Sequence, residues 1–394
     1  MKLIHMSDLH IGKSVNGFSM IEEQKHAFVQ VIGYIETERP GAVIIAGDVY
    51  DRAVPSVEAV RVFDDFLTQL AGMDVAVMLI PGNHDSSERL SFASRLLSEK
   101  RLHICGSLTS LSASHSPLSS GGSIQKVTLI DENGDVNFWL LPFIKPASIR
   151  GMYGEREIES YDDAVAAVLD VADVDYSVRN VLVSHQFYTK AGVAPIRSES
   201  ELNPVGGLDA VDAGLIERFD YAALGHLHGR QSVGSEHICY CGSPIKYSFS
   251  EWRHEKSVSI VELCEKGKLT VRLLPLIPIH NMREIKGRLS ILISNEVSSL
   301  ADTEDYLRVI LTDEEELIDP LGKLRSVYPN VMSLDFENSR TSIDIGAIST
   351  DSETVEKLSP FDLFCEFFLE AQGSAMSPVQ AAIARELLEA EDEE

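Results

Sequence analysis

The chain has 394 residues, 44% of them hydrophobic, which is enough for two or three domains with sizeable cores. Its 34 basic and 61 acidic residues give a formal net charge of −27, which argues against a protein that binds nucleic acid by itself. No apolar stretch approaches membrane-spanning length, and Asp8 and His10 interrupt any signal-like start, so we expect a cytoplasmic protein without a membrane partner.

Short apolar segments and longer amphipathic ones alternate over the first hundred residues. Three segments are typical of short, buried parallel strands: residues 3–7, 43–46 and 75–80. The spacing of apolar residues predicts three helices, at residues 20–38, 55–70 and 87–98. This alternation predicts a parallel sheet with right-handed crossovers.

The pattern changes after a Ser-rich segment, residues 107–123, which we expect to be a surface loop. Asn133-Gly134 between two apolar segments indicates a β-hairpin, and a helix is expected at residues 159–171. We expect a second, more antiparallel sheet from the strands 124–130, 136–141, 180–184, 221–224, 238–241, 256–263 and 269–274. The prediction is therefore an α/β fold in which two mixed sheets pack face to face with helices outside.

Pro275 and Pro278 mark a linker to the last third of the chain. Three elements beyond it predict a small α+β domain: strands at 288–293 and 307–312 and a helix at 318–328. Two helices are expected after it, one with Ser359 as its N-cap and one with the capping-box spacing of Ser377 and Gln380. The predicted domains are residues 1–275, 276–350 and 351–394.

Polar side chains follow the predicted strands at the point where each strand ends. In open α/β sheets, functional sites are built at the carboxyl ends of the strands. A mixture of carboxylate, imidazole and amide groups without thiolates suits Mn²⁺, Fe or Zn²⁺. The seven candidate metal ligands are Asp8, His10, Asp48, Asn83, His185, His226 and His228.

Seven ligands are too many for one ion but suffice for two ions if one carboxylate bridges them, and Asp48 is the predicted bridge. Two metal ions about 3.5–4 Å apart activate a water and hold a phosphoryl group for in-line displacement. Each motif alone also has a structural interpretation: Asp8 caps a turn, or His226-x-His228 is an ordinary strand end. Their joint occurrence at strand ends favours a metal site that hydrolyses a phosphate ester.

The short segments that contain the seven candidate ligands resemble the signature of the calcineurin-like metallophosphoesterases. Longer segments, among them Tyr240-Cys241-Gly242-Ser243-Pro244, resemble the SbcD family, the nuclease subunits of bacterial SbcCD complexes. The resemblance covers residues 1–275. The motifs that carry it are Asp8-x-His10, Gly47-Asp48-x-x-Asp51, Gly82-Asn83-His84-Asp85, His185 and Gly225-His226-x-His228.

The resemblance implies a role for each site residue. His84 would be a catalytic residue that contacts the scissile phosphate and stabilises or protonates the leaving oxygen, and the carboxylate of Asp51 would orient it. Two divalent ions, expected to be Mn²⁺, would bind. One ion would be held by Asp8, His10, Asp48 and His228, and the other by Asp48, Asn83, His185 and His226.

The implied activity is that of a DNA nuclease working with an SbcC-like ATPase in DNA end processing, replication, repair and recombination. It would act as a double-strand exonuclease and as a single-strand or hairpin endonuclease, with residues 276–350 as a capping domain over the DNA. A homodimer within a heterotetramer is left open. The alternatives are a phosphatase or cyclic-nucleotide phosphodiesterase, against which the long C-terminal extension argues, and a non-enzymatic scaffold.

The last two predicted helices each carry an apolar stripe. Phe361, Phe364, Cys365 and Phe368 recur at helical spacing in the first, and Val379, Ile383 and Leu387 in the second. One interpretation is that both stripes pack on the core of the chain. The interpretation we favour is a docking site for a groove of another protein, which the resemblance would make the ATPase.

Overall fold

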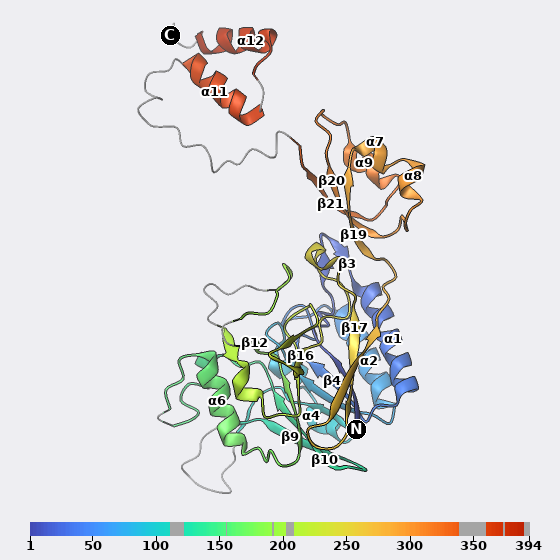
Figure 1. Cartoon of the computed structure of the whole chain (residues 1–394), viewed down its shortest axis with the longest axis vertical. Coiled ribbons are helices and arrows are strands. Elements are labelled where there is room, and N and C mark those ends of the chain that lie inside the picture. The colour runs from blue at the N-terminus through green and yellow to red at the C-terminus, as the bar shows by residue number, and fades with distance from the viewer. Residues whose placement is uncertain are drawn as a thin grey trace. The chain divides into compact units, whose positions relative to one another are not determined.

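Two six-stranded sheets form the core of the first of two units, Met1–Asn281, and the second unit is Met282–Glu394 (Figure 1). The computed structural model describes residues 1–110, 122–154, 156–190, 193–201, 209–338, 360–372 and 375–389. Within these residues, no helix has both the length and the apolar character that crossing a membrane requires.

The first sheet contains the strands of the predicted βαβ segment at its centre. β1 pairs in parallel with β4, and β4 with β5, as the strand–helix alternation predicted. The sheet order is β18 (Leu269–Pro275), β17 (Ser257–Leu263), β1 (Lys2–Met6), β4 (Ala42–Ala46), β5 (Ala76–Ile80) and β6 (Leu102–Ile104).

The second sheet contains the predicted hairpin at one edge. β9 and β10 are antiparallel and joined by Glu132-Asn133, and Gly134, the first residue of β10, has a positive φ of 98°, which a tight hairpin favours. The sheet order is β15 (Gln231–Val233), β16 (Ser235–Tyr240), β14 (Tyr221–Leu224), β11 (Arg179–Ser184), β10 (Gly134–Leu141) and β9 (Gln125–Asp131).

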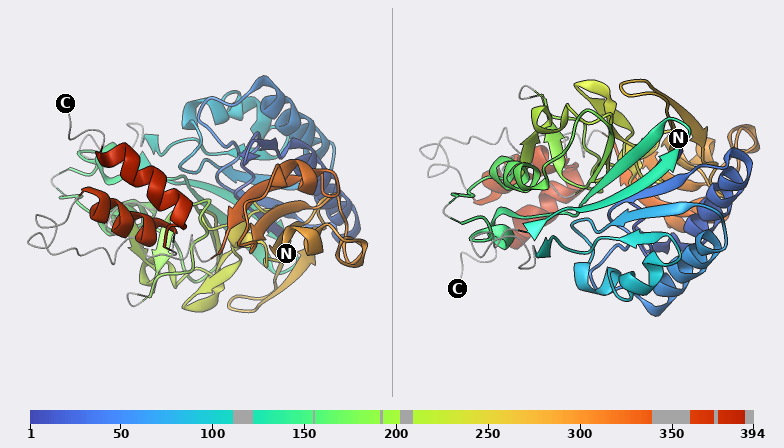
Figure 2. Two further views of the ribbon diagram at one scale, coloured as in Figure 1. Left: turned by 90° about the horizontal axis from the view of Figure 1, so that it is seen from above. Right: turned by 90° about the horizontal axis from the view of Figure 1, so that it is seen from below.

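Alternate residues of each strand face different cores. Ile44 and Phe138 belong to a fully buried cluster that contains inward-facing residues of both sheets. On the outer face of the first sheet, Ile45 packs with α1 (Ile21–Glu38) and α2 (Val57–Ala71), and α6 (Tyr161–Ala172) covers the second sheet (Figure 2). The expected sandwich of two mixed sheets with helices outside is confirmed.

The structure corrects the membership of two strands. β17 and β18, expected in the second sheet, extend the first one, because β17 pairs with β1 in antiparallel orientation. The second sheet is also not the more antiparallel one, since three of the five neighbouring pairs in each sheet are parallel. Local periodicity predicts a strand, but the edge to which a late strand adds is decided by packing.

Two predicted elements differ from the structure, one in continuity and one in type. The helix expected at residues 87–98 is two short helices, α3 (Ser87–Leu90) and α4 (Ser94–Ser98), because Ala93 adopts a left-handed conformation with φ of 59°. The strand expected at residues 288–293 is instead the helix α7 (Leu289–Leu292). Its isoleucines suggested a strand, but burial of Leu289 and Leu292 at i, i+3 spacing favours a helical turn.

The second unit contains a three-stranded parallel sheet whose one face is covered by short helices. Its core includes Leu307, Val309 and Tyr328, all buried. The elements are β19 (Met282–Gly287), α7, α8 (Asn295–Ser298), β20 (Tyr306–Leu311), α9 (Pro320–Arg325) and β21 (Val331–Phe336). β19 was not predicted and occupies the region immediately after the expected linker.

The two expected C-terminal helices are α11 (Pro360–Gln372) and α12 (Pro378–Glu389). The predicted capping box of α12 is present: the backbone N–H of Gln380 donates to Ser377 Oγ at 3.3 Å, and that of Ser377 donates to Gln380 Oε1 at 2.9 Å. Arg385 lies over the ring of Phe361, 4.4 Å from its centroid, so the two helices contact each other. The middle of the Ser-rich segment, residues 111–121, lies outside the described residues.

Candidate metal centre

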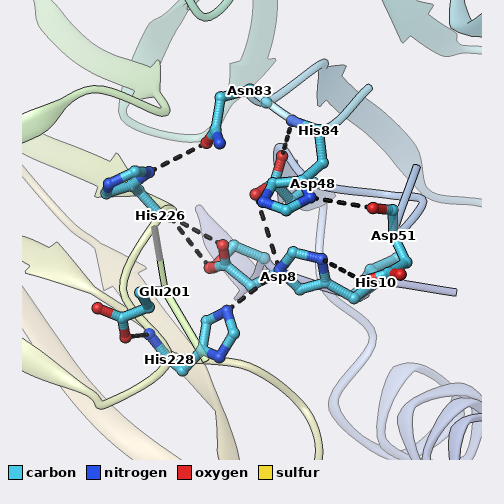
Figure 3. A network of polar contacts seen from close by, with 12 residues as sticks. Asp8, His10, Asp48, Asp51, Asn83, His84, Glu201, His226 and His228 are labelled. Atoms are coloured by element: carbon cyan, nitrogen blue, oxygen red, sulfur yellow. Dashed lines mark hydrogen bonds and ion pairs between the residues drawn. The ribbon is translucent and has the colours of Figure 1, made fainter. Parts of the chain in front are cut away.

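The carboxyl ends of strands from both sheets bring the candidate ligands to one place (Figure 3). Asp8 follows β1, Asp48 follows β4 and Asn83 follows β5 in the first sheet. His185 follows β11 and His226 follows β14 in the second sheet. Two sets of three have donor atoms within 4.8 Å of one another: Asp8, His10 and His228, and Asp8, Asp48 and His185.

The backbone at the centre adopts an unusual conformation. Asp8, His10, Asp48 and His226 have positive φ values of 54°, 40°, 48° and 108°, which residues other than glycine adopt at a cost in free energy. Hydrogen bonds between neighbouring loops hold two of them, with Asp8 N–H donating to Gly47 O at 3.0 Å and His10 N–H to Asp48 O at 2.9 Å. Such strain, concentrated in proposed ligands, is typical of a functional site.

Glycines permit the loops to approach this closely. A Cβ atom on Gly225 would lie 1.9 Å from the carbonyl oxygen of Ala46, and one on Gly82 would lie 2.1 Å from Asp48 Oδ1. Both glycines belong to the motifs that precede the candidate ligands. Any side chain at either position would push the two strand ends apart.

One group of candidate ligands includes a pair of imidazoles. His10 Nε2 lies 3.1 Å from His228 Nε2 and 3.7 Å from Asp48 Oδ2, and both histidines are buried. Two imidazole nitrogens facing each other at this distance fit two ligands of one ion, each about 2.1 Å from it. The geometry therefore fits the first predicted ligand group.

The second group lies on the other side of Asp48. His185 Nδ1–H donates to Ala46 O at 2.7 Å, so the other ring nitrogen, Nε2, is the one that faces Asp48 Oδ2, 3.2 Å away. Within the described residues this buried Nε2 has no hydrogen bond of acceptable geometry. His226 Nδ1 lies 3.1 Å from Asn83 Oδ1, so these two side chains also converge. Asp48 lies close to both groups, 3.7 Å from His10 and 3.2 Å from His185, and Asp8 also approaches the second group, with Oδ1 3.9 Å from His185 Nε2.

The electrostatics of the cluster favour a bound cation. Burial raises the pKa of the Asp8 carboxyl to about 8, and the charge of Asp48 adds to this. Burial opposes protonation of His185, but the carboxylates of Asp48 and Asp8 outweigh it and raise its pKa to about 9, so a divalent ion bound at Nε2 would take the place of a proton. Burial also lowers the pKa of His226 to about 3, so this imidazole is neutral and able to ligate. Divalent ions would neutralise the two buried carboxylates, so the residues present fit such ions.

His84 lies beside the two groups, and its contacts differ from the expected ones. Its backbone N–H donates to Asp48 Oδ1 at 2.9 Å, and its ring lies edge-on to His10 with centroids 4.8 Å apart. Its Nδ1–H donates to the carbonyl oxygen of Asp51 at 3.0 Å, whereas the Asp51 carboxylate pairs with Lys13 at 2.8 Å. The main chain of Asp51, not its carboxylate, therefore holds the imidazole. His84 also lies close enough to His10 and Asp48 to share an ion with them.

Comparison with known proteins gives a matching family model for each of the two units. Residues 1–230 match the family model of calcineurin-like phosphoesterases, and residues 278–372 match that of the type 5 capsule protein repressor C-terminal domain. The SbcD component of the nuclease SbcCD from Staphylococcus saprophyticus is 31% identical over 90% of this chain and 91% of its own length. The chain belongs to the SbcD family of calcineurin-like phosphoesterases.

A second SbcD relative, from Staphylococcus epidermidis, is 29% identical over 90% of this chain and 91% of its own length. A dimetal phosphatase from Danio rerio covers 71% of this chain and 97% of its own, at 13% identity and a TM-score of 0.39. Membership in the family makes the chain a hydrolase of phosphate esters and confirms the resemblance seen in the sequence.

Several residues that support the SbcD-type centre were not singled out as site residues from the sequence. Asp85 accepts hydrogen bonds from the backbone N–H groups of Gly82, Val49 and Tyr50 at 2.9–3.0 Å, and so ties the second strand-end loop to the third. Asp85 could have been identified from the sequence, because it directly follows His84 in the motif. Glu251, which contacts His228, had no such signal, because it lies outside all of the motifs and follows no predicted strand.

Proposed function

We propose that this chain is a DNA nuclease subunit that uses two divalent metal ions, Mn²⁺ in the cell. The observation that carries the proposal is the convergence of seven ligand side chains from five strand ends, beside His84, in a member of the SbcD family. The relatives are nuclease subunits by name, and they match this chain over nearly its whole length.

The proposed ligand groups follow the two halves of the cluster. Asp48 serves both ions. The first group is Asp8, His10, Asp48 and His228, and the second is Asp48, Asn83, His185 and His226. When bound, the two ions would polarise the phosphodiester and lower the pKa of the attacking water.

The protein itself supplies orientation and a proton at this site. Because Nδ1–H of His84 donates to Asp51 O, the other ring nitrogen, Nε2, carries the proton when the imidazole is charged. We propose that this proton goes to the leaving oxygen of the scissile phosphate. Asp51 is a positioning residue through its carbonyl group, and its carboxylate holds Lys13 beside the centre.

We further propose double-strand exonuclease and single-strand or hairpin endonuclease activity, in a cytoplasmic complex with an SbcC-like ATPase. We assign residues 276–350 as the capping domain and residues 351–394 as the partner-binding helices. The family match of residues 278–372 supports these assignments, because it covers most of the first region and the start of the second. A net charge of −27 is compatible with this role because metal ions supply positive charge at the phosphate and a partner supplies further DNA-binding surface.

A nuclease assay tests the proposal directly. Purified chain is incubated with a linear DNA duplex and, separately, with a nucleoside monophosphate and a cyclic nucleotide, with Mn²⁺ and then with EDTA. We expect cleavage of the duplex with Mn²⁺, none with EDTA, and little hydrolysis of the small substrates. Asp48→Asn should lose this activity, while Asp65→Asn, on the exposed face of α2, is the matched control. Hydrolysis of the nucleotides without cleavage of DNA would show a phosphatase or cyclic-nucleotide phosphodiesterase instead.

A further inference from the structure

A buried cluster of charged side chains surrounds His228 on the side away from the other candidate ligands. Glu251 is fully buried and Lys256 is 8% exposed. Glu251 Oε2 accepts a hydrogen bond from Lys256 Nζ at 2.6 Å, and Glu251 Oε1 lies 3.2 Å from His228 Nδ1. Burying a glutamate and a lysine is expensive, so the pair calls for an explanation beyond stability.

The cluster engages every polar group of His228 except one. Glu201 Oε1 accepts from the backbone N–H of His228 at 2.7 Å (Figure 3), and Lys256 Nζ donates to its carbonyl oxygen at 2.9 Å. Nδ1 lies within hydrogen-bond distance of both Ser200 Oγ, at 2.7 Å, and Glu251. Only Nε2 remains, and it is the atom that faces His10 Nε2 at 3.1 Å.

The hydrogen-bond network determines which ring nitrogen carries the proton. Lys256 uses its three ammonium protons on Glu251, on the carbonyl of His228 and on Ser243 Oγ at 2.8 Å, which leaves Glu251 an ionised acceptor. Ser200 Oγ donates its own proton to Glu251 Oε1 at 2.6 Å, so toward His228 it also acts as an acceptor. Because both groups that contact Nδ1 of His228 act as hydrogen-bond acceptors, Nδ1 must carry the proton and donate it.

We propose that Glu251, held by Lys256, is a positioning residue of the metal centre: it accepts the Nδ1–H of His228 and so fixes the tautomer that presents the Nε2 lone pair to a divalent ion. The inference rests on the proposed two-metal function and extends it to residues outside the family motifs. Carboxylates that bind the far nitrogen of a ligating histidine fix its orientation and increase its basicity.

The main test is the affinity for Mn²⁺, measured by calorimetric titration of the metal-free, full-length chain. In Glu251→Gln we expect one of two bound ions to bind about 10–100-fold more weakly and the other to bind as in the wild type. The matched control is Asp131→Asn, the same acid-to-amide change in another largely buried ion pair. Asp131 pairs with Arg179 at the start of β11, the opposite end of the strand from His185.

The outcomes separate the inference from the function on which it rests. A wild type that binds no Mn²⁺ contradicts the proposed function itself. If the wild type binds two ions, and Glu251→Gln binds both with unchanged affinity while its metal-free melting temperature falls like that of Asp131→Asn, then Glu251 is merely structural and the inference is wrong. Equal loss of metal affinity in both variants would also contradict it.

A second measurement does not depend on whether Glu251→Gln folds. In metal-free wild-type protein labelled with ¹⁵N-histidine, the ring nitrogen shifts of His228, assigned with His228→Gln, report its tautomer. We expect a protonated Nδ1 and an unprotonated Nε2 at neutral pH. Protonation at Nε2 would overturn the proposal whatever the variants show.

Discussion

At the scale of single residues, the imidazole of His84 is held by a main-chain carbonyl group and not by the carboxylate that was expected to orient it. His84 is held by two interactions: its backbone N–H donates to Asp48 Oδ1, and its Nδ1–H donates to the carbonyl of Asp51. A carbonyl oxygen accepts a hydrogen bond from the imidazole in both its neutral and its charged form. The ring therefore keeps one orientation throughout a cycle of proton transfer.

Replacement of His84 tests its separation from metal binding. His84→Gln should retain two bound Mn²⁺ ions, since the proposed ligand groups do not include His84, yet lose about 10²–10⁴ in rate, the usual contribution of a general acid. Metal content by elemental analysis and the rate on a linear duplex are measured on the same preparation. Loss of an ion together with activity would show that His84 is a ligand, as its proximity to His10 and Asp48 permits.

Asp51→Asn makes the matched comparison for His84. Because the substitution leaves the carbonyl that binds His84 unchanged, we expect a loss of rate clearly smaller than that of His84→Gln. The side chain should matter mainly through Lys13, which it pairs with at 2.8 Å. An Asp51→Asn enzyme as slow as His84→Gln would indicate that its carboxylate orients the imidazole during the reaction, as the resemblance first implied.

At the scale of elements, one buried arginine joins the two sheets. Arg179, the first residue of β11, donates to Asp131 of β9 and to the carbonyl of Gly134 in β10 at 2.8 Å. It also donates to the carbonyl of Cys264, just beyond β17 of the first sheet, at 2.8 Å. The hydrogen bond from Arg179 lowers the pKa of the Asp131 carboxyl well below its usual value.

The ion pair of Asp131 with Arg179 should make the free energy of unfolding depend on pH. A carboxyl whose pKa is lowered by folding stabilises the protein above its unfolded pKa of about 4, and this contribution is lost as the pH falls toward the folded value. Asp131→Asn should therefore cost about 1–3 kcal/mol of unfolding free energy at pH 7 and progressively less below pH 4. Urea unfolding at several pH values measures the difference. Asp74→Asn, in an exposed pair with Arg101, should change stability by less than about 1 kcal/mol.

Helix α1 binds the segment that leads to the second unit. Glu23, Gln30 and Tyr34 lie on one face of the helix and bind backbone groups at four positions between residues 275 and 280. Glu23 accepts the N–H groups of Ile279 and His280 at 2.9 and 3.0 Å. This predicted linker is therefore fixed along α1 as far as His280.

Removal of the Glu23 side chain should release that segment. Glu23→Ala leaves two backbone N–H groups without their acceptor. We therefore expect the free energy of unfolding to fall by about 1–3 kcal/mol and hydrogen exchange to become faster at Ile279 and His280. Glu22→Ala is the control, since Glu22 is exposed and pairs with Lys25 on the surface. Unchanged exchange at both amides would show that other contacts hold the segment.

At the scale of the whole molecule, the C-terminal helices retain apolar surface that their mutual contact does not cover. In α12, Val379, Ile383 and Leu387 are 69%, 54% and 67% exposed, although they form the predicted stripe. Phe367 of α11 is 64% exposed. An exposed amphipathic helix pair supports the proposal that these helices dock on a partner protein.

A truncation tests this docking proposal. A chain ending at residue 358 should remain folded and, with Mn²⁺, hydrolyse an activated aryl phosphodiester as fast as the full chain does, but no longer co-purify with a co-expressed SbcC-like ATPase. Replacing Val379, Ile383 and Leu387 together by serine in the full chain should have the same effect with α11 and α12 retained. An insoluble truncation would indicate that the helices complete the core, and unchanged co-purification would contradict the partner site.

The sequence by itself determined the central strands of both sheets and the placement of the candidate ligands after them. Buried parallel strands are short apolar segments, so polar residues such as Asp8, Asp48 and His185 at their ends stand out without knowledge of the partners. Because parallel strands carry their carboxyl ends to the same edge, this local pattern already implied that the side chains meet.

Only the tertiary structure decided which distant groups surround that edge. β17 and β18 joined the first sheet because β17 fits the free edge of β1, a choice that depends on packing and not on periodicity. The carboxylate of Glu251 and the ammonium group of Lys256 reach His228 from a segment outside the motifs, and Asp51, although part of a motif, binds His84 through its carbonyl group. Hydrogen bonds of this kind depend on the three-dimensional path of the chain, which residue spacing does not encode.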